Sequence, residues 1–158
     1  MHRVELYLAH HGLTVDAHDD MRRPRSERGR RALERVAAAA AERRVKPELI
    51  WHSGKLRAKQ TAEVYWRACN PLAALEATRD VQPDDQPQWM ADRLRFERRC
   101  ILIAGHYPHL PRLLATLLNG DSAGAVSFPM HGLVALSTAD DGASWSERWR
   151  LESHLEPV

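Results

Sequence analysis

The 158-residue chain has little cysteine and no long apolar run. Cys69 and Cys100 are its only cysteines, too few for a disulfide framework and wrongly spaced for a cysteine metal site. No segment approaches the roughly 18 apolar residues of a membrane span, and the first residues lack the basic and apolar parts of a secretion signal. We therefore expect a cytoplasmic protein with no membrane partner, in which both cysteines are small buried hydrophobic side chains.

Lysine is scarce as well, since it occurs only at positions 46, 55 and 59, whereas arginine accounts for 20 of the 23 basic residues. The formal net charge is only +2, and no basic run is interleaved with aromatic residues, so we expect no nucleic-acid partner. A coding bias explains the arginines most simply. The alternative is another anionic partner, because the arginine fork matches phosphate and carboxylate groups.

What the chain does contain is an alternation of strand and helix patterns. The sequence predicts helices near 26–44, 55–69, 88–98 and 108–118, and strands near 4–9, 48–52, 75–81, 100–104, 125–137 and 144–151. In the last strand, Trp145, Trp149 and Leu151 are expected on one face. A helix between two strands is typical of parallel pairing, and the length suits one domain spanning residues 1–158. We expect a single α/β domain.

The first predicted strand ends at two histidines. Val4 to Ala9 form a short apolar run, and His10, His11 and Gly12 follow it directly. Ligands of open α/β sheets bind outside the carboxyl ends of the strands, and a glycine there allows backbone N–H groups to approach an anion closely. On its own this pattern is weak, because a histidine at a strand end is more often a structural, hydrogen-bonded residue.

Two further strands repeat the pattern. One is followed by Arg57 in the first turn of the next helix, and another runs into His106. Imidazoles and a guanidinium that meet at one sheet edge would form an oxyanion pocket suited to a phosphoryl group. One histidine could attack phosphorus while the other groups hold the equatorial oxygens. The other histidines are expected to be structural or on the surface, although chain position could bring His18, His52 and His131 near the pocket.

Four short segments strengthen this interpretation because they occur in a fixed order. They are Leu-Ala-His-His-Gly at 8–12, Arg-Pro-Arg-Ser-Glu-Arg-Gly at 23–29, Ser-Gly-Lys-Leu-Arg-Ala-Lys-Gln-Thr-Ala at 53–62 and Gly-His-Tyr-Pro at 105–108. They resemble the Arg-His-Gly, RPLTERG, SPxxRAxQTA and GHxP motifs of the histidine phosphatase (phosphoglycerate mutase-like) superfamily. The length and the motif spacing are most similar to its small phosphohistidine phosphatase, SixA-like branch.

This resemblance implies a fold and a mechanism. The fold would be a three-layer α/β/α sandwich with a mostly parallel central sheet and no capping insertion. His11 would be the phosphorylated nucleophile of a phosphatase that acts on phosphohistidine in proteins, without a metal or cofactor. The other catalytic groups would be His10, Arg57 and His106. The phosphate would be bound by His10, Gly12, Arg57 and His106, with Arg23 as a further candidate.

One position departs from the resemblance, because His10 stands where the family has arginine. Arginine stays charged at any relevant pH, whereas histidine titrates near about 6.5. Losing a fixed bidentate cation would cost roughly 1–3 kcal/mol of anion binding. We therefore expect catalysis that is weakened or shifted to acid pH.

The proton donor is a second open point. Mutases and sugar phosphatases of the superfamily carry an acidic donor in a longer insertion, for which this chain has no clear equivalent. Asp19, Asp20, Glu76 and Asp80 are candidates, although each also fits an exposed loop carboxylate. Imidazole is a less basic leaving group than an alkoxide, so a missing donor favours a P–N substrate, and an open pocket would admit a protein surface.

Three alternatives stay open at this point. The chain could be a non-catalytic module that binds phosphorylated partners, or it could hydrolyse small phosphomonoesters. A metal site is a third possibility, with His10, His11, His106 and His109 as ligands, although Arg57 would repel a cation. The sequence specifies neither the substrate protein nor the oligomeric state.

Overall fold

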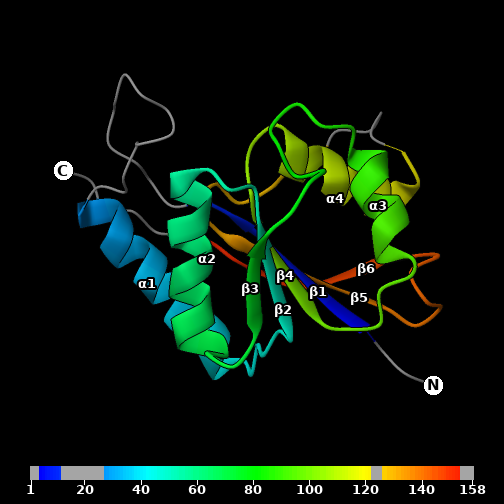
Figure 1. Ribbon diagram of the computed structural model, residues 1–158. Coiled ribbons are helices and arrows are strands. Elements are labelled where there is room, and N and C mark those ends of the chain that lie inside the picture. The colour runs from blue at the N-terminus through cyan, green and yellow to red at the C-terminus, as the bar shows by residue number, and fades with distance from the viewer. Residues whose placement is uncertain (1–3, 12–26, 122–125, 154–158) are drawn as a thin grey trace.

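A six-stranded sheet runs through the centre of the structure, a computed structural model that describes residues 4–11, 27–121 and 126–153 (Figure 1). The strand order is β3-β2-β4-β1-β5-β6. The strands are β1 (Val4–His10), β2 (Leu49–His52), β3 (Ala74–Ala77), β4 (Ile101–Gly105), β5 (Leu133–Thr138) and β6 (Ser146–Leu151). β1 to β4 are parallel, and β5 pairs antiparallel with both β1 and β6. The prediction of a mostly parallel sheet is confirmed.

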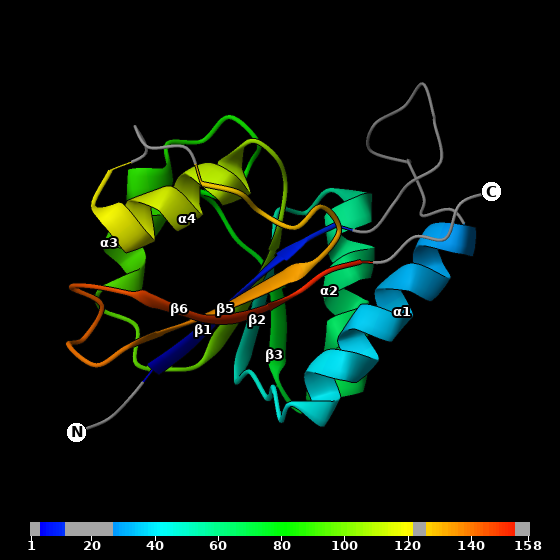
Figure 2. The ribbon, with the colours of Figure 1, turned by 180° about the vertical axis from the view of Figure 1, so that it is seen from behind.

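Helices cover both faces of the sheet. α1 (Glu27–Glu42) and α2 (Leu56–Cys69) lie side by side on one face, and α3 (Pro87–Leu94) and α4 (His109–Asn119) lie on the other. Figure 2 shows the same two helix pairs from behind, with the sheet between them. The molecule is therefore the predicted three-layer α/β/α sandwich. Among the described residues no capping insertion follows the second helix, since only residues 78–86 join β3 to α3.

The central strand β1 explains why the sheet is covered twice. Leu6 and Leu8 belong to the apolar core beneath α3 and α4, whereas Tyr7 and Ala9 belong to the core beneath α1 and α2. Successive side chains of a strand point to opposite faces, so a strand buried on both faces reads as one continuous apolar run. That run is what predicted β1 from the sequence.

The leucines of α4 anchor the helix to the sheet. Leu110, Leu113, Leu114 and Leu117 are all buried, and their spacing places them on one face of an α-helix. The helix ends at Gly120, whose φ of 89° is the left-handed conformation that glycine adopts most easily. Because α4 begins directly after β4, this packing fixes the position of the loop at the end of β4.

Several element boundaries differ from the predictions. The helix predicted to reach residue 98 ends at Leu94, and the strand predicted for 125–137 is only β5, because its first half contains Pro129 and Gly132. The prediction for the last strand is wrong in one respect. Trp145 precedes β6 and packs in the α3/α4 core, while Trp149 packs against the α1/α2 core.

None of the helices in the described part of the chain combines the length and the apolar character that a membrane span requires. Cys69 and Cys100 are free thiols that are only partly buried, rather than core residues, and burial raises the pKa of the Cys69 thiol to about 11. Such a thiol is mostly protonated near neutral pH, so it is a poor nucleophile.

Candidate active site

Parallel pairing brings the ends of three strands to one edge of the sheet. In the strand registers His10 pairs with Gly105, and His52 pairs with Ala104. The residues just beyond these strands therefore meet, although up to about a hundred positions separate them in the sequence. This convergence follows the general rule that the carboxyl ends of the strands form the binding edge of an α/β sheet.

His11 and His106 are neighbours at this edge. Their ring centroids lie 5.3 Å apart, and the backbone N–H of His11 donates to the carbonyl of Gly105 over 3.2 Å. His106 is almost completely buried, and its Nε2 is hydrogen-bonded to the hydroxyl of Ser53 at 2.6 Å. Ser53 follows β2, so the loop after β2 holds the ring that follows β4.

Arg57 comes from the first turn of α2 and is buried, with 7% of its surface exposed. Its positive charge contributes to lowering the pKa of His10, which puts the guanidinium within electrostatic range of that ring. The positive N-terminal end of α2 adds to the attraction for an anion. The structure thus brings His10, His11, Arg57 and His106 together as predicted. Gly12 and Arg23 lie outside the described residues.

His10 is held on several sides. The residue is 4% exposed, and its ring stacks on Tyr107 at 4.2 Å and on His131 at 4.8 Å between centroids. Its Nδ1 accepts a hydrogen bond of 2.8 Å from the backbone N–H of His131. A backbone N–H can only donate, so Nδ1 carries the lone pair and the neutral ring carries its hydrogen on Nε2.

The environment keeps His10 uncharged. Burial, and then the neighbouring His11, His131, His106 and Arg57, lower its pKa from 6.5 to about 2. The expectation that His10 titrates near neutral pH is therefore wrong. His10 offers an oxyanion one neutral N–H donor, and it does not replace the fixed charge of an arginine.

His131 is the residue at this edge that the sequence analysis placed only by chain position. It lies just before β5, and its Nδ1 is 2.8 Å from the backbone carbonyl oxygen of His11. A carbonyl oxygen only accepts, so Nδ1 must donate its hydrogen to it and Nε2 is left for another partner. No local sequence pattern around residue 131 predicts its contact with His11, because that contact depends on antiparallel pairing between β1 and β5.

A metal ion fits this cluster poorly. One ring nitrogen each of His10, His11 and His131 lies within 4.8 Å of the others, a different set from the four histidines considered in the sequence analysis. A metal ion bound at Nε2 of His10 would move the ring hydrogen to Nδ1, where it would break the hydrogen bond from the backbone N–H of His131. The positive charge of Arg57 also repels a cation. His109, at the start of α4, is buried, and its two ring nitrogens have no hydrogen-bond partner among the described residues.

The described carboxylates considered as proton donors are engaged elsewhere. Glu76 accepts a hydrogen bond from the indole N–H of Trp51, and Asp80 pairs with Arg93. Neither hydrogen-bonds with the histidine cluster. Asp19 and Asp20 lie outside the described residues.

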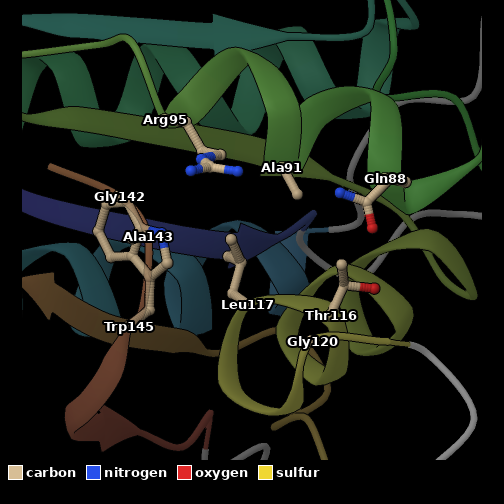
Figure 3. A pocket seen from close by; sticks show the side chains of 9 residues that line it. All are labelled: Gln88, Ala91, Arg95, Thr116, Leu117, Gly120, Gly142, Ala143 and Trp145. Carbon is tan, nitrogen blue, oxygen red and sulfur yellow. The ribbon is translucent and has the colours of Figure 1, made fainter. Parts of the chain in front are cut away.

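A cavity of about 210 Å³ lies at the other end of the sheet, between α3, the end of α4 and the loop that joins β5 to β6 (Figure 3). Arg95 and Trp145 line it, together with Gln88, Thr116 and five small or apolar residues. None of the predicted site residues lies there. The cavity is therefore separate from the histidine cluster.

Solved structures match this fold over nearly the whole chain. No protein-family model and no curated protein matches the sequence of the chain. A structure of the protein histidine phosphatase SixA complexed with tungstate has a TM-score of 0.84 at 21% identity, covering 95% of this chain and 97% of that one. A candidate phosphohistidine phosphatase SixA from Agrobacterium tumefaciens gives 0.77 at 23% identity over 94% and 97% of the two chains.

A third match is a phosphoglycerate mutase from Plasmodium falciparum, with a TM-score of 0.73 at 18% identity, covering 100% of this chain and 98% of that one. At identities this low, the TM-scores show a shared fold and nothing further. The chain therefore has the phosphoglycerate mutase-like fold of the histidine phosphatases, in the compact form of the SixA structures.

Proposed function

We infer that this protein is a phosphatase of the SixA type, which hydrolyses phosphohistidine on proteins through a covalent phosphohistidine at His11. The observation that carries this proposal is the meeting of His11, Arg57 and His106 at the carboxyl edge of the sheet. The similar SixA structure contains tungstate, which is a tetrahedral oxyanion like phosphate. The four ordered sequence motifs support the same assignment.

The first chemical step transfers the phosphoryl group to His11. A lone pair on the His11 ring forms a P–N bond as the P–N bond to the substrate imidazole breaks, and that imidazole leaves with the bonding electrons. The guanidinium of Arg57 and the N–H donors of the neighbouring rings hold the equatorial oxygens, where charge accumulates. In the second step water attacks phosphorus, the bond to His11 breaks, and inorganic phosphate is released.

A P–N substrate suits the groups at this edge. The two described carboxylates considered as proton donors, Glu76 and Asp80, have other partners. An alkoxide leaving group needs a proton from such an acid, whereas an imidazole leaves as a much weaker base. The proposed mechanism uses no metal ion or cofactor.

A second candidate function is recognition of a phosphorylated protein without hydrolysis. The observation that favours it is the neutral His10, which removes one fixed charge from the pocket. Small phosphorylated molecules are a further possible class of substrate, because the described residues place no capping insertion over this edge.

Trapping of the covalent intermediate by a rapid quench into alkaline denaturant separates catalysis from recognition. The protein is mixed with a protein substrate that carries ³²P on histidine, and the reaction is stopped within one turnover. An enzyme acquires a label that is stable in base and labile in acid, and His11→Asn acquires none. A purely binding protein stays unlabelled, and label retained in His11→Asn would refute the assignment of the nucleophile. Arg95→Ala, which lines the separate cavity, serves as the control.

A further inference from the structure

We propose that His131 binds the oxyanion in this pocket, where its protonated ring supplies the positive charge that an arginine at position 10 would provide. The proposal rests on the proposed function, since it concerns the same phosphoryl site. It adds one residue and a consequence, because anion binding then takes up a proton.

The charge balance of the pocket calls for such a group. Phosphoryl groups carry about two negative charges near neutral pH. Arg57 supplies one buried positive charge, and His10 is neutral. His11 must keep a lone pair in order to attack phosphorus, and Nε2 of His106 is already hydrogen-bonded to Ser53. His131 is the remaining imidazole of the cluster.

The hydrogen bonds of His131 leave it ready for this role. Nδ1 donates to the carbonyl of His11 in both the neutral and the charged ring. Gaining a proton at Nε2 therefore needs no rearrangement of the ring. Among the described residues no ion pair joins a carboxylate to His131, whose hydrogen-bond partners are at the end of β1.

The separation of the rings matches one tetrahedral anion. Ring nitrogens of His10, His11 and His131 lie within 4.8 Å of one another. Two donors at such a separation can each reach an oxygen of the same phosphate when their N–H···O bonds of about 2.8 Å run roughly parallel. This separation allows the rings of His10, His11 and His131 to face one anion.

The ring of His131 packs on the end of β1, and the groups around its partner His10 come from two further elements. His10 and His11 of the β1 end contact the ring directly. Tyr107, after β4, stacks on the far partner His10, and Arg57 of α2 acts on the same ring. Arg150, near the end of β6, and Glu152, just after it, both affect the pKa of Tyr107.

The backbone at this position makes a clean test possible. His131 has a φ of 58°, a left-handed conformation that glycine and asparagine adopt with the least strain. His131→Gly and His131→Asn therefore keep the backbone N–H that holds His10. They remove the ionisable ring together with its bond to the carbonyl of His11, a loss that does not depend on pH. His52→Asn is the matched control, because His52 is also a buried histidine at a strand end.

The probe is inorganic sulfate, which keeps its charge of −2 across the pH range, so any pH dependence of binding belongs to the protein. Calorimetry at about pH 6 and about pH 8.5 gives the dissociation constants, and imidazole is the side chain whose charge changes between these values. We expect His131→Gly and His131→Asn to weaken binding about tenfold or more at the lower pH and less than about threefold at the higher pH. His52→Asn should behave like the wild type at both.

A purely structural role for His131 would weaken binding by the same factor at both pH values, and that result would overturn the proposal. Wild-type affinity in both variants would overturn it as well. Since sulfate is not hydrolysed, the measurement is independent of catalysis. Hydrolysis that survives in His11→Asn would refute the proposed function and leave the sulfate result standing.

Discussion

The backbone N–H of His131 donates a 2.8 Å hydrogen bond to Nδ1 of His10, although 121 positions separate the two residues in the sequence. This one bond fixes which nitrogen of His10 carries the hydrogen and helps to keep the buried ring neutral. It also ties the loop before β5 to the end of β1. The uncharged state of residue 10 in this pocket therefore depends on the end of β1 and on the loop before β5 together, and not on the histidine side chain alone.

Arg57 is expected to stabilise the transition state by charge and by its forked geometry. Arg57→Ala should lower kcat/KM for a phosphohistidine protein about 10²- to 10³-fold, and Arg57→Lys should recover only part of this loss, since an ammonium group cannot make a bidentate contact. Steady-state phosphate release measures both. A lysine variant as active as the wild type would show that charge alone matters.

Ser53 is expected to orient His106. Its hydroxyl is hydrogen-bonded to Nε2 of that ring at 2.6 Å, and its carbonyl accepts from the side chain of Gln82. Ser53→Ala should reduce kcat about 2- to 10-fold, which corresponds to a hydrogen bond of about 0.5–1.5 kcal/mol, while Ser53→Thr keeps the hydroxyl and most of the activity. Equal losses in the two variants would contradict an orienting hydroxyl.

Position 10 is expected to tolerate a side chain with a hydrogen-bond acceptor better than a positively charged side chain. Arginine has no acceptor for the His131 N–H and would add a charge beside Arg57, whereas the side-chain oxygen of glutamine can accept. His10→Arg should lose about 1–3 kcal/mol of unfolding free energy more than His10→Gln. Urea titrations monitored by circular dichroism compare the two. An arginine variant as stable as the glutamine variant would show that the buried bond is dispensable.

Buried neutral histidines predict a loss of stability in acid. Burial lowers the pKa of His109, as it does for His10. In the unfolded chain each ring titrates near about 6.5, so below that pH the unfolded state binds protons that the folded state does not. Stability is then complete at higher pH and falls as the pH drops. One such histidine removes about 2 kcal/mol between pH 7 and pH 5.

His109 provides the test of this linkage, because its ring nitrogens have no hydrogen-bond partner among the described residues and leucine can fill the space without orphaning a polar group. His109→Leu should flatten the pH dependence of the unfolding free energy between pH 7 and pH 5 by up to the share of one histidine. Urea unfolding at several pH values measures the slope. An unchanged slope would mean that His109 takes up its proton equally well in the folded state.

The sequence by itself determined most of the helices and strands, and the site residues that directly follow parallel strands. Apolar runs in β1 and β4, and the leucine spacing of α4, are local patterns whose meaning depends only on the period of a strand or helix. The rule that ligands bind at the carboxyl ends of parallel strands then placed His11, Arg57 and His106 together. Errors at the ends of α3 and β5 arose where local patterns were weak or were interrupted by proline and glycine.

Only the tertiary structure decided the protonation of His10 and the position of His131. A pKa depends on burial and on charges brought from other strands and helices, and none of these can be read from the neighbours of residue 10 in the chain. His131 reaches the site because β5 pairs antiparallel with β1, a non-local choice that the residues around position 131 do not encode. Local patterns fix which groups stand at strand ends, and long-range packing fixes what charge they carry.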